Sequence, residues 1–273
     1  MGTARDPDGS EPRLGAVLDG KYRVDALLGE GGMGAVYRVH HVGLRRDLAL
    51  KVLRPEITSH PDVAARFDRE AWSAARLEHP NCLRVTDFGT TDGGLKYMVM
   101  ELLRGRELSA LLDGPLAPDR AVALTLQIVR GLEHAHGQGI VHRDIKPDNV
   151  FITVDHEGRE LAKLVDFGIA KVLEGDGGGA SPKLTRAGMV FGTPRYMSPE
   201  QAAGGEIDHR TDLYSVGIML YQMLAGTVPF ATGDLVKVLR QQIIMPPPPL
   251  PEHVPAGLRG VVERLLEKDR DDR

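Results

Sequence analysis

The sequence predicts an α+β fold in which a β-rich segment with one main helix precedes a helix-rich segment. From Tyr22 to Glu101, short runs of β-branched and alternating apolar residues surround a single stretch of helical spacing. After Glu101 the apolar residues recur mainly at helical spacing, at 108–112, 121–138 and 212–224. This segregation of strands from helices suggests two lobes with a cleft between them.

The boundary between the lobes is expected near residues 102–105, where the pattern changes. We therefore assign residues 14–102 to a β-rich first lobe and residues 103–273 to a helical second lobe. Residues 1–13 are rich in Asp, Pro, Gly and Arg, so we expect a disordered lead and no secretory signal. The chain stops at Arg273, which leaves open that the second lobe is truncated and the sequence a fragment.

Composition narrows the class of protein. Apolar residues make up 42% of the 273 residues, enough for a substantial core. A formal net charge of −4 argues against a general binder of nucleic acid or membrane surfaces. Cys82 is the only cysteine, which excludes an intrachain disulfide and a C-x-x-C metal site and fits a reducing cytoplasm. No apolar run approaches the roughly 18 residues of a membrane helix, so we expect a cytoplasmic chain.

Local patterns define the elements of the first lobe. The expected strands are Val36–Val39, Leu48–Leu53, Val85–Phe88 and Leu95–Glu101, with a turn at Asp92–Gly94 before the last. A helix is expected over 62–77, with an apolar face formed by Val63, Phe67, Ala71 and Ala74. Glu70 projects near that face, and a carboxylate in such a place usually has a partner.

The glycines at 29–34 read Gly-Glu-Gly-Gly-Met-Gly and fit the pattern G-x-G-x-x-G. A dinucleotide-binding motif needs a helix directly after it, whereas Ala35–Val39 is β-rich. The segment therefore predicts a hairpin whose backbone N–H groups can approach phosphates, since glycine lacks the Cβ that would block them. Taken alone, an ordinary glycine hairpin explains the motif equally well.

Lys51 interrupts the apolar run Ala49–Leu53 and is either an exposed edge residue or a functional cation. Its spacing after the glycine hairpin, together with Glu70 on the following helix, favours the second reading. An ammonium held by that carboxylate has a fixed place from which to contact phosphate oxygens.

The strongest pattern is Val141–Val150, which reads Val-His-Arg-Asp-Ile-Lys-Pro-Asp-Asn-Val. Asp144 precedes Asn149 by five residues, and Asp166-Phe167-Gly168 follows after a short predicted β-hairpin. Together they supply a carboxylate for a substrate hydroxyl, and an amide oxygen and a second carboxylate for Mg²⁺. Each piece alone is also explained as a turn or a cap, but the order and spacing together leave little room for coincidence.

At these motifs the sequence resembles the eukaryotic-like protein kinases, over about Tyr22 to Arg273. Ser198-Pro199-Glu200 stands where Ala-Pro-Glu is usual, and Asp212 lies in a stretch that matches the family's helix after the activation segment. The amino-acid sequences at 31–34 and 198–201 are most similar to those of bacterial Hanks-type Ser/Thr kinases. The resemblance implies the bilobal protein-kinase fold with ATP in the cleft, and the activity of a non-specific serine/threonine protein kinase.

The resemblance also implies catalytic roles. Lys51 would contact the α- and β-phosphates and pair with Glu70. Asp144 would accept the proton of the substrate hydroxyl, and Lys146 would neutralise charge on the γ-phosphoryl. Asn149 and Asp166 would hold Mg²⁺, with Mn²⁺ as an alternative. In the same family an arginine in the stretch that matches Glu267–Arg273 pairs with the glutamate that matches Glu200.

The residues that the resemblance assigns to ATP binding are Leu28, Gly29, Glu30, Gly31, Gly32, Met33, Gly34, Ala35, Val36, Ala49, Lys51, Met100, Glu101, Leu103, Asn149, Phe151 and Asp166. Val36, Ala49 and Phe151 would sandwich adenine, and the backbone of Glu101 and Leu103 would bind its edge. Met100 would be the gatekeeper of a back pocket. Plain core packing explains Met100 and Phe151 about equally well.

Substrate class and regulation follow from the same resemblance. Lys146, two residues after Asp144, indicates a Ser/Thr kinase, and Thr193 would line the pocket for the substrate residue. Thr185 is the expected autophosphorylation site, with Ser181 as the competing one, and Arg143 would receive the phosphate. An unmodified loop threonine is the plain alternative for Thr185.

Two other functions stay open at this point. A small-molecule phosphotransferase of kinase-like fold would share the spacing from Asp144 to Asn149 but generally lacks the segment that ends in Ser198-Pro199-Glu200. A pseudokinase that acts as a binding module would be expected to lose Lys51, Asp144 or Asp166. The expected partners are ATP, protein substrates and a second copy for autophosphorylation, without nucleic acid. A membrane anchor would require a C-terminal segment beyond this chain.

Overall fold

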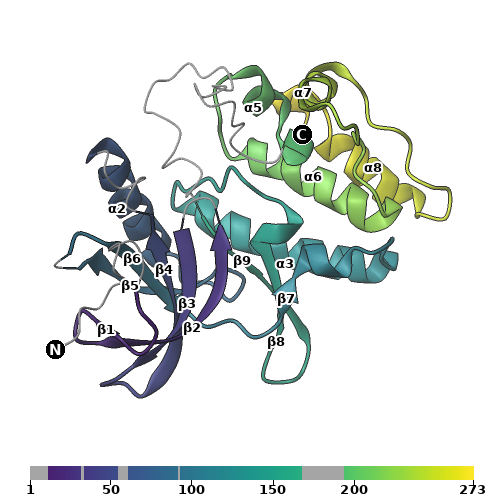
Figure 1. Cartoon of the computed structure of the whole chain (residues 1–273). Coiled ribbons are helices and arrows are strands. Elements are labelled where there is room, and N and C mark those ends of the chain that lie inside the picture. Colours follow the sequence, from purple (N-terminus) through teal and green to yellow (C-terminus); the bar gives the residue numbers. More distant parts are fainter. Residues whose placement is uncertain (1–11, 32–33, 55–60, 92, 168–193) are drawn as a thin grey trace. The chain divides into compact units, whose positions relative to one another are not determined.

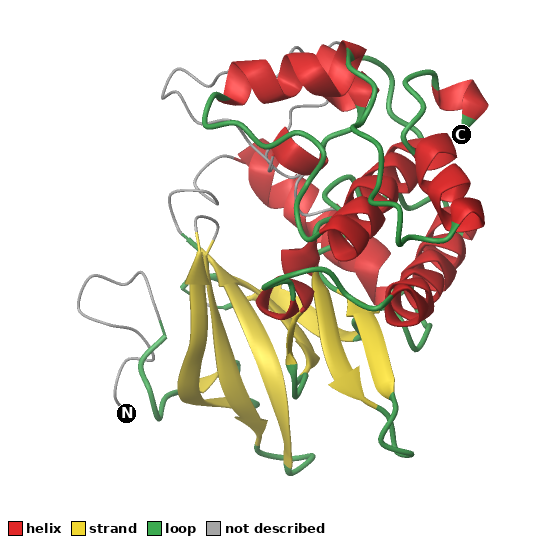
Figure 2. Cartoon of the chain, turned by 90° about the vertical axis from the view of Figure 1, so that its right-hand side faces the viewer, coloured by secondary structure: helices red, strands yellow, loops and turns green. Residues whose placement is uncertain are grey.

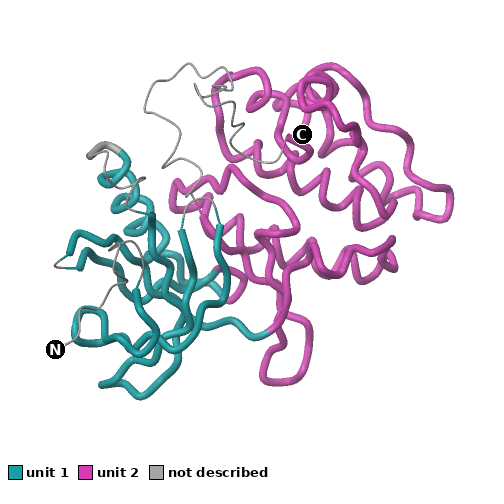
Figure 3. Tube along the Cα trace, viewed as in Figure 1, with its two compact units in different colours: residues 1–79, 83–104 teal, residues 80–82, 105–273 magenta. Residues whose placement is uncertain are grey.

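The computed structural model describes residues 12–31, 34–54, 61–91, 93–167 and 194–273 (Figure 1). Most of the strands precede most of the helices along the chain. The chain contains both kinds of element, as Figure 2 shows, which confirms the α+β class. Two compact units divide the chain (Figure 3). Unit 1 comprises residues 1–79 and 83–104, and unit 2 comprises residues 80–82 and 105–273. The expected disordered lead, 1–13, lies outside the described residues except for its last two.

Unit 1 is built on one antiparallel sheet with the strand order β1-β2-β3-β4-β6-β5. The strands are β1 (Val17–Leu18), β2 (Tyr22–Gly31), β3 (Gly34–His41), β4 (Arg46–Leu53), β5 (Val85–Thr90) and β6 (Lys96–Glu101). All four strands expected from the sequence are present. Strands β3, β4 and β5 are longer than expected because the ladder extends into polar residues at their ends, whereas β6 begins one residue later than expected.

The sheet has two chemically different faces because side chains alternate along each strand. One face carries the hydrophobic core of unit 1, formed by Leu18, Tyr22, Val24, Ala35, Tyr37, Val39, Leu48, Leu50, Val52, Leu95, Tyr97 and Val99. The residues between them on β3, β4 and β6 point to the other face. That face presents Val36, Lys51 and Met98 as direct cross-strand neighbours.

Helix α2 (Pro61–Ala75) is the single described helix of unit 1 and packs near β5. Phe67 and Ala71 are fully buried and Ala74 nearly so, which confirms three of the four residues of the predicted apolar face, while Val63 is half-buried. Glu70, between them in sequence, is half-buried. Burial of this face supplies most of the helix's stability, because a helix of this length is marginal alone.

Unit 2 contains most of the helices of the described chain. They are α3 (Pro118–Gly137), α5 (Pro199–Ala203), α6 (Arg210–Ala225), α7 (Leu235–Ile244) and α8 (Ala256–Leu265). The predicted helix at 108–112 is instead a short 3₁₀ helix, Leu108–Leu111. The proline patch at 246–249 connects α7 and α8, as expected for residues without backbone N–H donors. None of the described helices is long and apolar enough to cross a membrane.

A small antiparallel sheet in unit 2 brings distant residues together. Strands β7 (Arg106–Glu107), β8 (Val150–Val154) and β9 (Glu160–Leu164) pair in that order. The short segment 80–82 belongs here because Leu164 donates its N–H to Asn81 (2.8 Å) and pairs with Cys82. Burial raises the pKa of the Cys82 thiol to about 12, so this cysteine is an inert part of the core.

A buried ion pair joins Glu200 on α5 to Arg273. The guanidinium donates to both carboxylate oxygens at 2.7 Å, and its remaining N–H groups bond to the carbonyls of Arg210, Glu267 and Lys268. The Arg273 side chain is fully buried. Burial alone would raise the pKa of Glu200, but hydrogen bonds from Arg273 and Thr211 hold it below its ordinary range. The expected pairing of Glu200 with an arginine of the stretch 267–273 is therefore confirmed, and the arginine is Arg273.

We predict that Arg273→Met lowers the free energy of unfolding by about 3–5 kcal/mol, because Glu200 is left as a buried charge without its cation. Chemical denaturation at neutral pH measures the loss. Because the pKa of Glu200 is lowered in the folded state, the pair contributes its full stability above the ordinary pKa of a glutamate. The difference in unfolding free energy between wild type and Arg273→Met shrinks as the pH falls below that value and through the lowered pKa of the folded state.

The matched control is Arg120→Met, which removes a guanidinium from the exposed ion pair with Glu160. Exposed pairs of this kind contribute less than about 1 kcal/mol. Equal losses in the two variants would contradict the role assigned to the buried pair.

Candidate functional site

The glycine motif forms the predicted hairpin. Strands β2 and β3 pair up to Gly31 and Gly34, so no helix follows the motif and the dinucleotide-binding reading is excluded. Gly32 and Met33 lie outside the described residues. A Cβ added to Gly34 would lie 1.8 Å from the carbonyl oxygen of Val52, so only glycine fits there.

The strand before the turn is irregular and open to solvent. The register of β2 against β3 shifts between Leu27 and Gly29, which places Leu28 at a bulge with half of its surface exposed. Glu30 forms an exposed ion pair with Arg54 at 2.5 Å. Gly29 and Ala35 take their places in the ladder. The hairpin therefore presents backbone and small residues near its tip.

Lys51 lies in the middle of β4 on the sheet face opposite the core. Its cross-strand neighbours are Val36 on β3 and Met98 on β6, and it is only 8% exposed. One row further along, Ala49 stands opposite Met100, and both are buried. Alternation thus places four of the expected nucleotide-binding residues on one face. The pairing of Lys51 with Glu70 stays a prediction.

The end of β6 holds the segment expected to bind the adenine edge. Glu101 donates its backbone N–H to the carbonyl of Arg84 (3.0 Å) and accepts the Arg84 N–H on its side chain (2.9 Å). Glu101 and Leu103 are both half-buried. Because the N–H of Glu101 is engaged, its carbonyl is the backbone group that could meet a ligand.

The loop before β8 gathers the three polar residues that the sequence singled out. The carboxylate of Asp144 lies 2.9 Å from the ammonium of Lys146 and accepts a hydrogen bond of 2.9 Å from Nδ2 of Asn149. Nδ2 of Asn149 also donates to the backbone carbonyl of Asp144 (2.7 Å). Since both acceptors meet Nδ2, the amide orientation is fixed and Oδ1 is the atom turned to other partners.

The β8–β9 hairpin places Asp166 beside this loop. Val150 pairs with Leu164, and Val165 donates its N–H to the carbonyl of Asn149 (3.0 Å). Asp166 follows at once and adopts a left-handed φ of 62°, which is uncommon for a residue with a side chain. Amide and carboxylate oxygens are hard ligands, so Asn149 and Asp166 suit a cation such as Mg²⁺. Phe151, also on β8, is half-buried.

His142 links the loop to the end of the hairpin. Its Nε2 lies 2.9 Å from the carbonyl of Val165, and because a carbonyl only accepts, Nε2 carries the proton. Nδ1 then accepts the backbone N–H of Asp144 (3.4 Å). The imidazole is fully buried and packs against the ring of Phe167, with 4.7 Å between the ring centroids.

Asp212, near the start of α6, binds the backbone of the loop just before Asp144. Its fully buried carboxylate accepts the backbone N–H groups of His142 (2.9 Å) and Arg143 (2.8 Å). His136 of α3 adds a third contact at 2.8 Å through Nε2. The sequence had marked Asp212 only as part of a matching helix, and the direction of its side chain had no local signal.

Besides Gly32 and Met33, four more residues of the expected site fall in segments that the structure does not describe. Gly168 and the candidates Ser181, Thr185 and Thr193 lie outside the described residues. The described chain resumes at Pro194, in the 3₁₀ helix Pro194–Tyr196. Gln242, fully buried on α7, donates to the carbonyls of Pro194 (3.2 Å) and Arg195 (2.8 Å).

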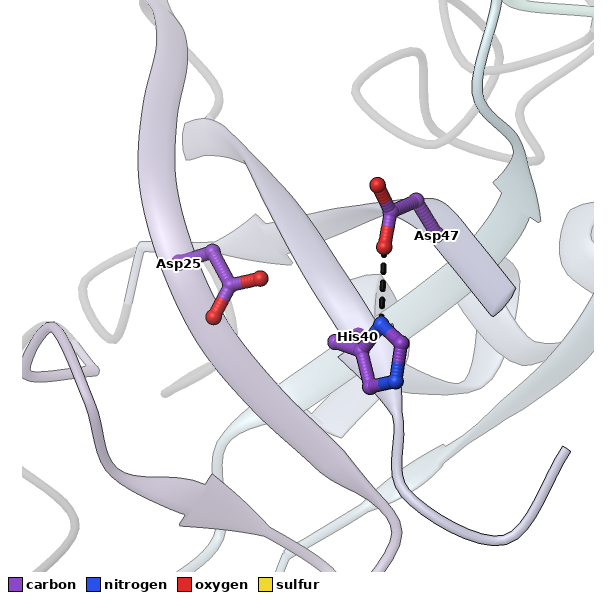
Figure 4. A group of neighbouring side chains, drawn as sticks. All are labelled: Asp25, His40 and Asp47. Carbon is purple, nitrogen blue, oxygen red and sulfur yellow. Dashed lines mark hydrogen bonds and ion pairs between the residues drawn. The ribbon is translucent and has the colours of Figure 1, made fainter. Parts of the chain in front are cut away.

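A second group of metal-ligand residues lies on strands β2, β3 and β4. Figure 4 shows Asp25, His40 and Asp47, with His40 bonded to Asp47 at 2.8 Å. Arg23 already binds both oxygens of Asp25, at 2.7 and 3.3 Å, and lowers its pKa. A guanidinium in this position competes directly with any cation. We therefore interpret the group as a surface network of hydrogen bonds and ion pairs.

The sequence of this chain matches a known protein family and several known proteins. Residues 22–273 match the protein kinase domain family. Serine/threonine-protein kinase pkn3 of Myxococcus xanthus is 43% identical over 268 residues, which cover 96% of this chain and 48% of that protein. Serine/threonine-protein kinase PknA of Mycobacterium tuberculosis is 39% identical over 264 residues, which cover 94% and 59%.

Solved structures agree with the fold. A double mutant of the PknI kinase domain of Mycobacterium tuberculosis superposes with a TM-score of 0.71 at 29% identity, and the match covers 96% of this chain and 93% of that one. The chain spans less than two thirds of the length of the curated relatives named above.

Proposed function

Since the chain belongs to the protein kinase domain family, we propose that it transfers the γ-phosphoryl group of ATP to serine and threonine hydroxyls of proteins. The observation that carries the proposal is the arrangement of Asp144, Lys146 and Asn149 around one carboxylate. The similar proteins pkn3 and PknA are serine/threonine-protein kinases. Retention of Lys51, Asp144 and Asp166 disfavours a pseudokinase.

Three residues of the loop before β8 would have different roles in the transfer to the substrate hydroxyl. Asp144 would orient the substrate hydroxyl and accept its proton. The ammonium of Lys146 lies 2.9 Å from that carboxylate and would neutralise negative charge on the γ-phosphoryl group during transfer. Asn149 holds Asp144 through two hydrogen bonds, so the base enters the reaction already positioned.

Asn149 and Asp166 would hold a divalent metal ion, and we propose Mg²⁺. The donor set consists of hard oxygen atoms, and Nδ2 of Asn149 is occupied by Asp144, which leaves Oδ1 as the ligand atom. A bound Mg²⁺ would neutralise charge on the phosphates. The chain's own contribution is the β8–β9 pairing, which brings the two residues to adjacent backbone positions.

Unit 1 would supply the groups for the rest of the nucleotide. Val36 and Ala49 offer small apolar surfaces on the face that carries Lys51, and Lys51 would reach the α- and β-phosphates. The carbonyl of Glu101 and the N–H of Leu103 would bind the adenine edge, because the N–H of Glu101 is engaged by Arg84. Glu70, half-buried on α2, would hold the Lys51 ammonium.

The segment Ser198-Pro199-Glu200, with its buried ion pair to Arg273, argues for a protein substrate rather than a small molecule. We further propose that the protein acts in the cytoplasm, where ATP is available and where the buried Cys82 stays reduced. Thr193 would line the pocket for the substrate residue, and two copies would meet for autophosphorylation.

Asp144→Asn should reduce transfer about 100-fold or more while the affinity for ATP stays near wild type, because an amide cannot accept the proton. Single-turnover transfer of labelled phosphate to a basic protein measures the rate, and titration with a fluorescent ATP analogue measures affinity. Asp148→Asn is the matched control, since Asp148 is exposed in the same loop. Equal turnover by Asp144→Asn and wild type would remove the assignment.

Lys51→Met should lower transfer by orders of magnitude, because no methionine can provide the point charge of an ammonium. Glu70→Gln should act in the same direction more weakly. Rates at saturating Mg·ATP test both. Lys96→Met controls for loss of a lysine from the same sheet, since Lys96 pairs with Asp68 at 2.6 Å. An active Lys51→Met variant would make the glycine hairpin a purely structural feature.

We propose that Thr185 is autophosphorylated and that the phosphate raises activity, because it would add about −1.5 to −2 charge for Arg143 to bind. Incubation with Mg·ATP followed by mass spectrometry maps the sites, and Thr185→Ala should phosphorylate an exogenous substrate more slowly. Ser181→Ala is the matched control. A wild type that is active without phosphate on Thr185 contradicts the switch and leaves the kinase activity standing.

A further inference from the structure

Hydrogen bonds hold two consecutive peptide planes in the loop around Arg143, the one before this residue and the one after it. Arg143 adopts a left-handed φ of 68°, which costs a residue with a side chain roughly 1–2 kcal/mol. Asp212 accepts the N–H of Arg143 (2.8 Å), in the peptide before this residue. The peptide after it contains the carbonyl of Arg143 and the N–H of Asp144. That carbonyl accepts a hydrogen bond of 2.7 Å from Nε2 of Gln201.

Gln201 uses both ends of its amide at once. Oε1 of Gln201 accepts the backbone N–H of Ser198 (3.0 Å). The backbone N–H of Gln201 donates to Oγ of Ser198 (3.2 Å), which completes a capping box at the start of α5. Nε2 is therefore left to donate to Arg143. Because Oε1 meets a donor and Nε2 meets an acceptor, the amide has one orientation that satisfies both partners.

We propose that Gln201 is a positioning residue for phosphoryl transfer, which fixes the orientation of Asp144 through the carbonyl of Arg143. The inference rests on the proposed kinase function. The carbonyl of Arg143 and the N–H of Asp144 share one plane, so a bond to the carbonyl sets the direction from which the Asp144 side chain leaves the backbone. His142 holds the N–H end of the same plane at 3.4 Å.

A purely structural role predicts something different. A glutamate caps a helix at this position as well as a glutamine does, because its oxygen accepts the same N–H of Ser198. A carboxylate cannot donate to the carbonyl of Arg143, however. Gln201→Glu therefore keeps the cap and replaces the hydrogen bond to the loop with a repulsive contact between two oxygen atoms. Ser198→Ala does the reverse, since it removes the Oγ acceptor and leaves both side-chain bonds of Gln201.

The experiment compares the full chain with its Gln201→Glu and Ser198→Ala variants at neutral pH. For Gln201→Glu we expect a kcat about tenfold lower, with KM for ATP and the unfolding temperature near wild type. Amide hydrogen exchange at Asp144 should become faster. For Ser198→Ala we expect a lower unfolding temperature, and kcat close to wild type at a temperature where the variant is folded.

Three results would overturn the inference. The first is a Gln201→Glu variant with wild-type kcat. The second is a loss of kcat that matches the loss of folded protein, as a cap alone would give. The third is unchanged exchange at Asp144. A wild type that transfers no phosphate to any protein contradicts the proposed function instead, and the exchange measurement still decides whether Gln201 holds the loop.

Discussion

The buried carboxylate of Asp212 is the constraint on which the loop from His142 to Asn149 depends. A fully buried charge is costly unless donors surround it, and here two backbone N–H groups and His136 do so. Those N–H groups belong to His142 and Arg143, so satisfying the charge determines the path of the chain just before Asp144. Helix α6 therefore determines the geometry of a loop about 70 residues earlier in sequence.

The same logic extends outward from the loop. His142 can bond to Val165 only when its backbone is held as it is, and its ring then packs on Phe167. Asp166 lies between those two residues and takes a left-handed φ. Strained residues of this kind persist where the surroundings over-determine them. At Arg143, which also has a left-handed φ, these surroundings are α6 and α5, and at Asp166 they include the β8–β9 hairpin.

Sequence periodicity predicted the elements whose faces differ in polarity. The local pattern was sufficient for β3, β4, β5 and β6 of unit 1, and a slip of one residue in β4 would have moved Lys51 into the core. Helix α2 was predictable from the spacing of Phe67, Ala71 and Ala74. Helices α7 and α8 were missed, and 108–112 became a 3₁₀ turn, because short segments carry weak periodic signals and tertiary contacts decide them.

In the site, the motif residues were predictable but the contacts that orient them were not. Asp144, Asn149 and Asp166 stood out because of their chemistry and spacing. The bond from Gln201 to Arg143 joins residues 58 positions apart, and that from Asp212 to Arg143 joins residues 69 apart. No local pattern encodes such distant pairs. The short segment at 80–82 joins unit 2 for the same reason.

The burial of Cys82 makes this chain convenient for spectroscopy. It is the only cysteine in the sequence, it is 1% exposed, and its thiol stays protonated at neutral pH. Maleimides and similar reagents react with exposed thiolates, so we expect Cys82 to stay unmodified by them. A single cysteine introduced on the surface would then carry a fluorophore or spin label at one defined position, with no need to replace the native residue.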